Sequence, residues 1–107
     1  MILVSRLFFV KNYVGLTLWP FIIVKDATLK NDTVLINHEK IHLKQQLELL
    51  VVFFYVFYLV EWCVRCICYV DSYKAYKNIS FEREAYANER NLNYPSARSA
   101  FSFIKYL

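Results

Sequence analysis

Residues 31–50, NDTVLINHEKIHLKQQLELL, decide how this chain folds. The stretch opens with a cluster of residue types that favour helix N-caps and continues without Gly or Pro. We therefore predict a long helix that begins near Thr33. His38 and His42, the only two histidines of the chain, are four residues apart and share one face of that helix. Glu39 is rotated by about 100° from His38.

This H-E-x-x-H spacing is typical of helices that bind a zinc ion (Zn²⁺). Two imidazoles at i and i+4 can reach one metal ion, and Glu39 projects beside it, where a general base would stand. A catalytic zinc ion has three protein ligands and a water molecule. Because the chain has no third histidine, a downstream carboxylate must complete the set. Gln45, one turn beyond His42, is expected to hydrogen-bond near the site.

The composition points to a small protein with more apolar surface than it can bury. At 107 residues we expect one domain, residues 1–107. The 58% of hydrophobic residues exceeds what so small an interior can hold, so part of the surface is expected to meet a membrane, a partner or another copy of the chain. The net charge of +4 is spread along the chain without a basic block, so no nucleic-acid partner is expected.

Upstream of the motif the sequence favours β structure. Residues 14–19 are rich in β-formers, and residues 21–24 are a short apolar run after Pro20. Because Pro20 lacks an N–H group, this strand begins there or sits at a sheet edge. We predict a small hairpin or irregular sheet over residues 13–35. The predicted fold class is therefore α+β, mainly α.

Downstream, residues 47–70 are strongly apolar, but their uninterrupted apolar stretch is residues 49–60. A membrane span needs about 20 residues, and each of Glu61 and Arg65 would cost about 2.5–3.5 kcal/mol near mid-bilayer. A buried or membrane-surface helix is therefore favoured over a single span. The run also holds three cysteines that we expect to be small buried residues, a thiol redox role being the weaker alternative because no βαβ pattern surrounds them: Cys63, Cys66 and Cys68.

The last third of the chain predicts shorter helices. A break at Asp71 and a short helix or turn over residues 73–78 come first. Ser80 is then expected as the N-cap of a helix over residues 81–92, which ends before Pro95. The tail, residues 96–107, alternates basic and aromatic residues and forms either a packed closing helix or an interfacial anchor.

Residues 81–87, FEREAYA, resemble the second helix of gluzincin metallopeptidases, in which a glutamate joins the H-E-x-x-H histidines. The pair of motifs is also similar to small uncharacterised bacterial proteins that carry H-E-x-x-H-x-x-Q followed by F-E-R-E-A-Y. The resemblance implies a minimal zincin-like core of a motif helix, an apolar helix and a glutamate-bearing helix. It implies that His38 and His42 bind zinc, that Glu39 is the base, and that Glu82 is the third ligand.

The resemblance has one departure and one alternative. The family's aspartate, four residues after the glutamate, is Tyr86 here. Either the Tyr86 hydroxyl orients a zinc-bound histidine or another group does. Glu84 with Asn88 offers the same spacing, which keeps Glu84 as the alternative third ligand.

The Glu82 assignment makes a demand on the fold. A straight helix from His42 to Val70 would carry the chain about 42 Å from the site, and the 12 steps back to Glu82 span about 40 Å only when fully extended. The helix must therefore bend or end early, and we predict a break within residues 49–54. An unbroken helix would exclude Glu82 as a ligand.

These inferences predict a zinc-dependent peptidase that acts on a peptide or protein substrate from a peripheral or monotopic position on the cytoplasmic side of a membrane, with a single span as the alternative. The strand at residues 21–24 is expected to pair with an extended substrate. The rival hypothesis is a non-catalytic, membrane-associated or oligomeric module with a structural or vestigial zinc site. The oxyanion donor is expected among four tyrosines, between which the sequence does not choose: Tyr69, Tyr73, Tyr86 and Tyr94.

Overall fold

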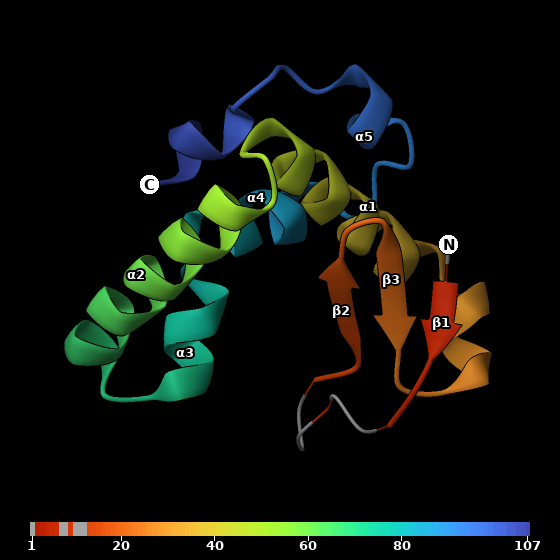
Figure 1. Ribbon diagram of the computed structural model, residues 1–107, viewed down its shortest axis with the longest axis horizontal. Coiled ribbons are helices and arrows are strands. Elements are labelled where there is room, and N and C mark those ends of the chain that lie inside the picture. The colour runs from red at the N-terminus through yellow and green to blue at the C-terminus, as the bar shows by residue number, and fades with distance from the viewer. Residues whose placement is uncertain (1, 7–8, 10–12) are drawn as a thin grey trace.

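The computed structural model describes residues 2–6, 9 and 13–107, and its fold is α+β, mainly α, as predicted. A small sheet lies on one side of the molecule and most of the helices on the other, with the motif helix running behind the sheet and above it (Figure 1). The elements in chain order are β1 (Ile2–Val4), β2 (Gly15–Leu18), β3 (Phe21–Val24), η1 (Ala27–Asn31), α1 (Thr33–Glu48), α2 (Val52–Tyr69), α3 (Ser72–Lys77), α4 (Ser80–Asn88), α5 (Tyr94–Ala97) and η2 (Ser102–Tyr106).

The sheet contains the expected hairpin and one further strand. β2 and β3 pair antiparallel across Trp19-Pro20, whose peptide bond is cis, and β3 begins directly after the proline. β1 pairs with β3 in parallel, so the order is β1-β3-β2 and β3 is central. Ile22 and Val24 of β3 are buried with Ile36 of α1, which fixes the sheet against the motif helix. β2 is left at an edge of the sheet.

The motif helix α1 starts where the sequence predicts, and its end confirms the predicted break. Asp32 caps its N-terminus. At the other end the N–H of Leu50 donates to Leu47 O at 3.3 Å and the N–H of Val51 donates to Gln46 O at 2.7 Å. This pair of bonds is a Schellman motif, which satisfies the last carbonyl groups of a helix.

The Schellman turn is made without glycine. Leu50 has φ 55° and Val51 has φ 64°, both in the left-handed region that favours glycine. α2 then restarts at Val52 in a new direction. The chain therefore turns back as the Glu82 assignment requires.

α2 lies on the rest of the protein along one narrow stripe. Its buried or half-buried residues include Phe54, Tyr58, Glu61, Trp62 and Arg65, spaced at helical intervals. Of the two forms favoured from the sequence, a buried helix and a membrane-surface helix, the structure excludes the buried one, because only 6% of α2 is buried. The helix is long and apolar enough to cross a membrane. The expectation of buried cysteines is wrong, because two of the three, Cys63 and Cys68, are exposed.

α4 begins with an acceptor supplied by α2. Ile79, not Ser80, is the N-cap residue, and its side chain makes no capping bond. Glu61 of α2 accepts instead, at 3.0 Å from the Ser80 N–H and 2.5 Å from the Ser80 hydroxyl. The predicted cap is therefore one residue out of place, because a distant carboxylate supplies the capping acceptor.

α4 also ends four residues earlier than predicted, at Asn88. The Asn37 side chain of α1 donates to the carbonyl oxygens of Glu89 at 2.8 Å and Asn91 at 2.9 Å. These bonds hold the segment after α4 against α1 as a loop.

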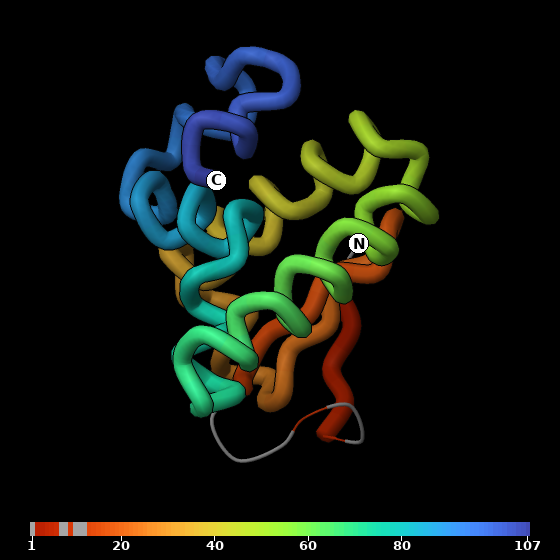
Figure 2. Tube along the Cα trace, turned by 90° about the vertical axis from the view of Figure 1, so that its left-hand side faces the viewer, coloured from red at the N-terminus to blue at the C-terminus, as the bar shows by residue number. Residues whose placement is uncertain are grey.

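The tail packs against α4, as one of its two predicted forms requires. η2 lies beside α4 near the C-terminus (Figure 2). Phe103 of η2 joins a core cluster with Phe54, Ile79 and Phe81, and its ring centroid is 4.6 Å from that of Phe81. This cluster supports the helix that carries Glu82.

Candidate metal centre

Two helices bring three buried ligand atoms together. α1 supplies His38 and His42, and α4 supplies Glu82. Glu82 Oε1 lies 3.0 Å from Nε2 of each histidine, and the two Nε2 atoms are 3.2 Å apart. The ligand atoms of a tetrahedral zinc ion with bonds of about 2.0–2.1 Å are about 3.3–3.4 Å apart. The donor set and its spacing therefore fit zinc, and the group could hold a metal ion.

The outer nitrogen of each imidazole faces an acceptor. His38 Nδ1–H donates to Glu89 Oε1 at 2.8 Å, and His42 Nδ1–H donates to Gln45 Oε1 at 2.7 Å. With the proton on Nδ1, each Nε2 keeps its lone pair directed at the centre. Gln45 lies where a hydrogen bond near the site was expected. The role of Glu89 was missed, because only the loop after α4 brings this carboxylate back to His38.

Tyr86 lies beside the centre without holding a histidine through its hydroxyl. Its ring packs edge-on against His38 with centroids 4.5 Å apart, and its hydroxyl lies 3.0 Å from that of Tyr76. Of the two alternatives for orienting a histidine, the structure therefore has the other group, Glu89.

Glu84, the alternative third ligand, faces away from the histidines. It is fully buried and forms an ion pair with Arg98, whose Nε lies 2.6 Å from Glu84 Oε2. Only Glu82 of the two carboxylates joins His38 and His42.

The three ligands carry charges that compensate one another. Burial opposes the charged form of His42, but Glu82, together with Glu39 and Gln45, outweighs burial and raises the pKa of His42 to about 9. The pKa of His38 is raised by the Glu82 carboxylate against the opposing effect of burial. Burial would raise the pKa of Glu82, yet the two histidines hold it well below its ordinary value. Glu82 therefore favours the charged form of both histidines, and the histidines favour the charged form of Glu82.

The second oxygen of Glu82 has its own partner. The Tyr58 hydroxyl of α2 donates to Glu82 Oε2 at 2.6 Å. Burial, reinforced by the charge of Glu82, raises the pKa of Tyr58 well above its ordinary value, so the phenol remains a donor. Glu82 consequently presents one oxygen, Oε1, to the histidines.

Glu39 is held beside the centre by the edge strand β2. The Thr17 hydroxyl donates to Glu39 Oε1 at 2.8 Å. Gly15, the only glycine of the chain, lies so close that a Cβ there would be 3.1 Å from Glu39 Oε2. Burial raises the pKa of Glu39, and the two histidines counteract the rise in part. β2 therefore positions this carboxylate by one hydrogen bond and by the space that a glycine leaves.

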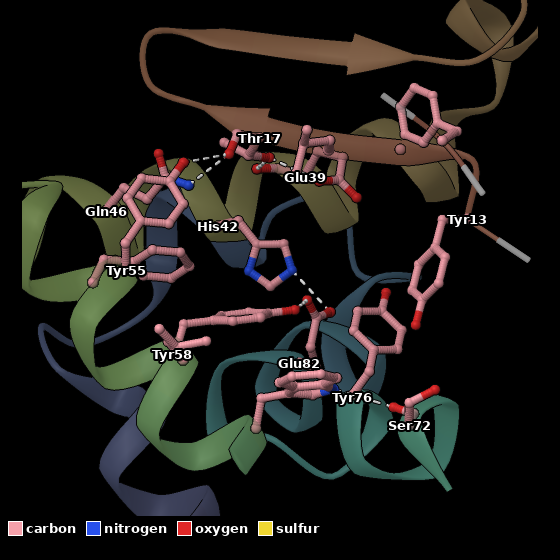
Figure 3. A pocket seen from close by; sticks show the side chains of 16 residues that line it. Tyr13, Thr17, Glu39, His42, Gln46, Tyr55, Tyr58, Ser72, Tyr76 and Glu82 are labelled. Carbon is pink, nitrogen blue, oxygen red and sulfur yellow. Dashed lines mark hydrogen bonds and ion pairs between the residues drawn. The ribbon is translucent and has the colours of Figure 1, made fainter. Parts of the chain in front are cut away.

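Two clefts meet at Glu39. The larger, about 690 Å³, lies between β2 and α2 and is bordered by Glu39, His42 and Glu82 (Figure 3). Its α2 wall is apolar and aromatic. A second cleft of about 460 Å³ is also bordered by Gly15 and Glu39. Its lining is more polar and includes His38 and Arg90. Glu39 therefore borders both clefts.

Comparison with known protein families, with curated proteins and with solved structures finds no match to this chain. The function must accordingly be argued from the chemistry of the site.

Proposed function

We propose that this chain is a zinc-dependent peptidase domain that hydrolyses peptide bonds with Glu39 as its general base. The observation that carries the proposal is the position of Glu39. It lines the same cleft as His42 and Glu82 but is not one of the three grouped ligands. A carboxylate in that place is free to exchange protons with a molecule in the cleft. The resemblance of both motifs to gluzincins supports the same interpretation.

His38 and His42 would hold the metal through Nε2, and Glu82 through Oε1. Zinc bound there would lower the pKa of a water molecule to about 7 and polarise a substrate carbonyl group. Glu39 would accept the proton of the attacking water on Oε2, the oxygen that Thr17 does not occupy, and pass it to the leaving amine. The pKa of Glu39, raised by burial, suits this carboxylate to hold that proton.

We assign the oxyanion donor to Tyr76 of α3, which borders both clefts. Burial and the charge of Glu82 raise the pKa of Tyr76 far above its ordinary value, so its hydroxyl keeps its proton. When the Tyr86 hydroxyl donates to Tyr76, the Tyr76 O–H is free to donate into the cleft. Tyr94, one of the four tyrosines considered from the sequence, donates to Glu84 instead.

The strand that would pair with a substrate is β2, not the strand at residues 21–24 as expected from the sequence. β3 is flanked by β1 and β2, so its edges are used within the sheet. β2 has an outer edge that borders the larger cleft. Gln46 and Tyr55 both donate to Thr17 O at 2.8 Å, which leaves the Gly15 end of β2 for a peptide backbone. Because the cleft wall opposite is aromatic, we propose that the preferred substrates carry bulky apolar side chains.

The alternative is a non-catalytic module with a structural or vestigial zinc site. A structural zinc ion has four protein ligands. Within residues 2–6, 9 and 13–107, the grouped ligands are three, and the cleft borders them. This arrangement favours the catalytic proposal.

Metal analysis and peptide cleavage test the proposal together. We expect one zinc ion per chain in the wild type and a large loss in His38→Ala. Glu39→Gln should keep its zinc and lose cleavage of an apolar peptide library by about 10²–10⁴-fold. Lys40→Gln, an exposed neighbour on the same helix, is the control and should match the wild type. A wild type without stoichiometric zinc would refute the metal site, and zinc without cleavage would leave the non-catalytic module.

We also propose that the outer face of α2 binds an anionic membrane surface on the cytoplasmic side. Glu61 and Arg65, the two charges of α2, both lie on its half-buried stripe, so the exposed face is uncharged. The net charge of +4 favours anionic lipid. A peripheral or monotopic position suits this helix better than a span, because spanning would break the two hydrogen bonds that Ser80 donates to Glu61.

Vesicle co-sedimentation tests the membrane proposal. Phe57→Ser and Val64→Ser, on the exposed face of α2, should abolish binding to anionic vesicles without lowering the melting temperature. Leu92→Ser, an equally exposed apolar residue outside α2, is the matched control. The wild type could instead fail to bind vesicles and form a dimer that these α2 variants do not form. That result would mean that a second copy of the chain covers the exposed face of α2.

A further inference from the structure

We propose that Glu84 and Arg98 are positioning residues for the metal ligand His42 and that they act through Gln45. The proposal rests on the metal site proposed above and gives that site a dependence on the C-terminal segment. Arg98 directly follows α5 and is far from the H-E-x-x-H motif in sequence. It would nevertheless help to decide which ring nitrogen of His42 carries the proton.

The orientation of the Gln45 amide is the first step. Gln45 is fully buried, and its Nε2 donates to Phe81 O at 3.1 Å and to Glu84 Oε1 at 3.0 Å. Both of these partners are acceptors, so both amide protons are directed at them. The Gln45 oxygen is thereby left to face His42 Nδ1, from which it accepts at 2.7 Å.

The reversed amide would disable the ligand. Its oxygen would face the Glu84 carboxylate and the Phe81 carbonyl, and its NH₂ group would face His42 Nδ1. Nδ1 would then have to accept, which places the imidazole proton on Nε2. Nε2 is the atom directed at Glu82 Oε1 and at the centre. A protonated Nε2 would have no lone pair with which to bind a metal ion there.

Glu84 can fix the amide because the other partners of its carboxylate, among the residues that the structure describes, are donors. Arg98 binds it in a fork, with Nε 2.6 Å from Oε2 and Nη2 3.0 Å from Oε1. The Tyr94 hydroxyl donates to Oε2 at 2.8 Å. The carboxylate is fully buried, and the guanidinium supplies a compensating charge in direct contact with both of its oxygens.

Arg98 has a second carboxylate partner, which provides a matched control. Its Nη1 donates to Glu48 Oε2 at 2.7 Å, and Glu48 lies on α1 like the histidines. Among the bonds described for residues 2–6, 9 and 13–107, the Glu48 side chain contacts Arg98 but neither Gln45 nor His42. Glu48→Gln therefore weakens the ion pairs of Arg98 without touching the amide that faces the ligand.

Zinc affinity, measured on the full chain by competition with a chromophoric chelator, tests the proposal. Glu84→Gln and Gln45→Leu should each weaken zinc binding by about 10- to 100-fold, the usual effect of removing a group that orients a ligand. The double variant should be no weaker than Gln45→Leu, because both changes act on one amide. Glu48→Gln should lower the melting temperature and change zinc affinity by less than about twofold.

Tyr94→Phe covers the case in which Glu84→Gln does not fold. It removes one of the donors to Glu84 and leaves the ion pair, so we expect a folded protein with a smaller loss of zinc affinity. Equal losses in Glu84→Gln and Glu48→Gln, or additive losses in the double variant, would mean that the ion pairs only stabilise the fold and would overturn the proposal. A wild type that fails to bind zinc would instead refute the proposed function.

Discussion

Replacing Gly15 by alanine is expected to impair the proposed peptidase while its zinc site stays filled. The new Cβ would lie 3.1 Å from Glu39 Oε2 and 3.1 Å from Leu35 Cδ1, against 3.4 Å or more in an ordinary contact. The leucine methyl group can swing away. The Glu39 carboxylate resists movement because Thr17 donates to its other oxygen at 2.8 Å. Glu39 must therefore shift by a few tenths of an ångström.

The size of that shift sets the expected loss. A misplacement of about 1 Å costs about 10²-fold in rate, so a few tenths should lower kcat/KM by about threefold to tenfold. Alanine in a strand is more stable than glycine by about 0.5–1 kcal/mol, and the tight contact opposes this gain. We therefore expect the melting temperature to change by less than about 5 °C.

Three measurements on Gly15→Ala test the reasoning: cleavage of a fluorogenic apolar peptide, zinc content and thermal unfolding. Val4→Ala, an exposed site on the far strand β1, is the control and should match the wild type in all three. Wild-type cleavage by Gly15→Ala would show that Glu39 tolerates the methyl group. Loss of zinc in step with loss of cleavage would show that the glycine supports the metal centre as a whole and not the base.

Three further outcomes are expected. Leu50→Gly should raise the free energy of unfolding by about 0.5–1 kcal/mol in chemical denaturation, because Leu50 is 73% exposed and has φ 55°; a decrease would mean that the side chain packs. Tyr58→Phe should weaken zinc binding about tenfold in chelator competition, because Glu82 Oε2 loses its donor; an unchanged affinity would contradict this. In the metal-free protein, the pKa of His42 is raised from 6.5 to about 9, so its stabilising effect of about 3 kcal/mol is present below pH 6.5 and lost as the pH rises through about 9. The melting temperature of chelator-treated protein should fall over that range, and saturating zinc should remove the trend.

The sequence predicts best what depends on helical spacing. The distance between His38 and His42 places both on one face of α1, and the need for Glu82 to return predicts the bend. The turn itself is harder to foresee, because Leu50 and Val51 are poor residues for a left-handed backbone. The requirement of a distant contact predicted the break where local preferences did not.

What the sequence could not predict depends on contacts between distant segments. Glu89 reaches His38 because Asn37 holds the loop after α4, and neither residue belongs to a periodic pattern with the other. The pairing of β1 with β3 is equally non-local, and it covers the outer edge of β3 while leaving the outer edge of β2. Glu84 resembled a ligand by spacing, but its partner Arg98 lies in the tail.

Hydropathy alone also misjudged α2, because it counts charges without assigning them to a face. Glu61 and Arg65 both fall on the half-buried stripe, so they do not interrupt the exposed apolar face. Over its 18 residues that face extends for about 27 Å. The two charges therefore argue against a span while leaving the outer surface as apolar as a lipid-facing helix.

The bend at Leu50 links the metal centre to this exposed surface. Because the chain turns there, one stripe of α2 contacts the metal centre and the core. Tyr58 donates to Glu82, and Phe54 packs in the adjacent core cluster. α1 and α4 carry the ligands, and α3 packs on the same side of α2 as they do. In the part of the chain that the structure describes, the opposite face stays exposed, as at Phe57 and Val64. The geometry that closes the three-ligand group therefore also leaves the apolar outer face of α2 exposed.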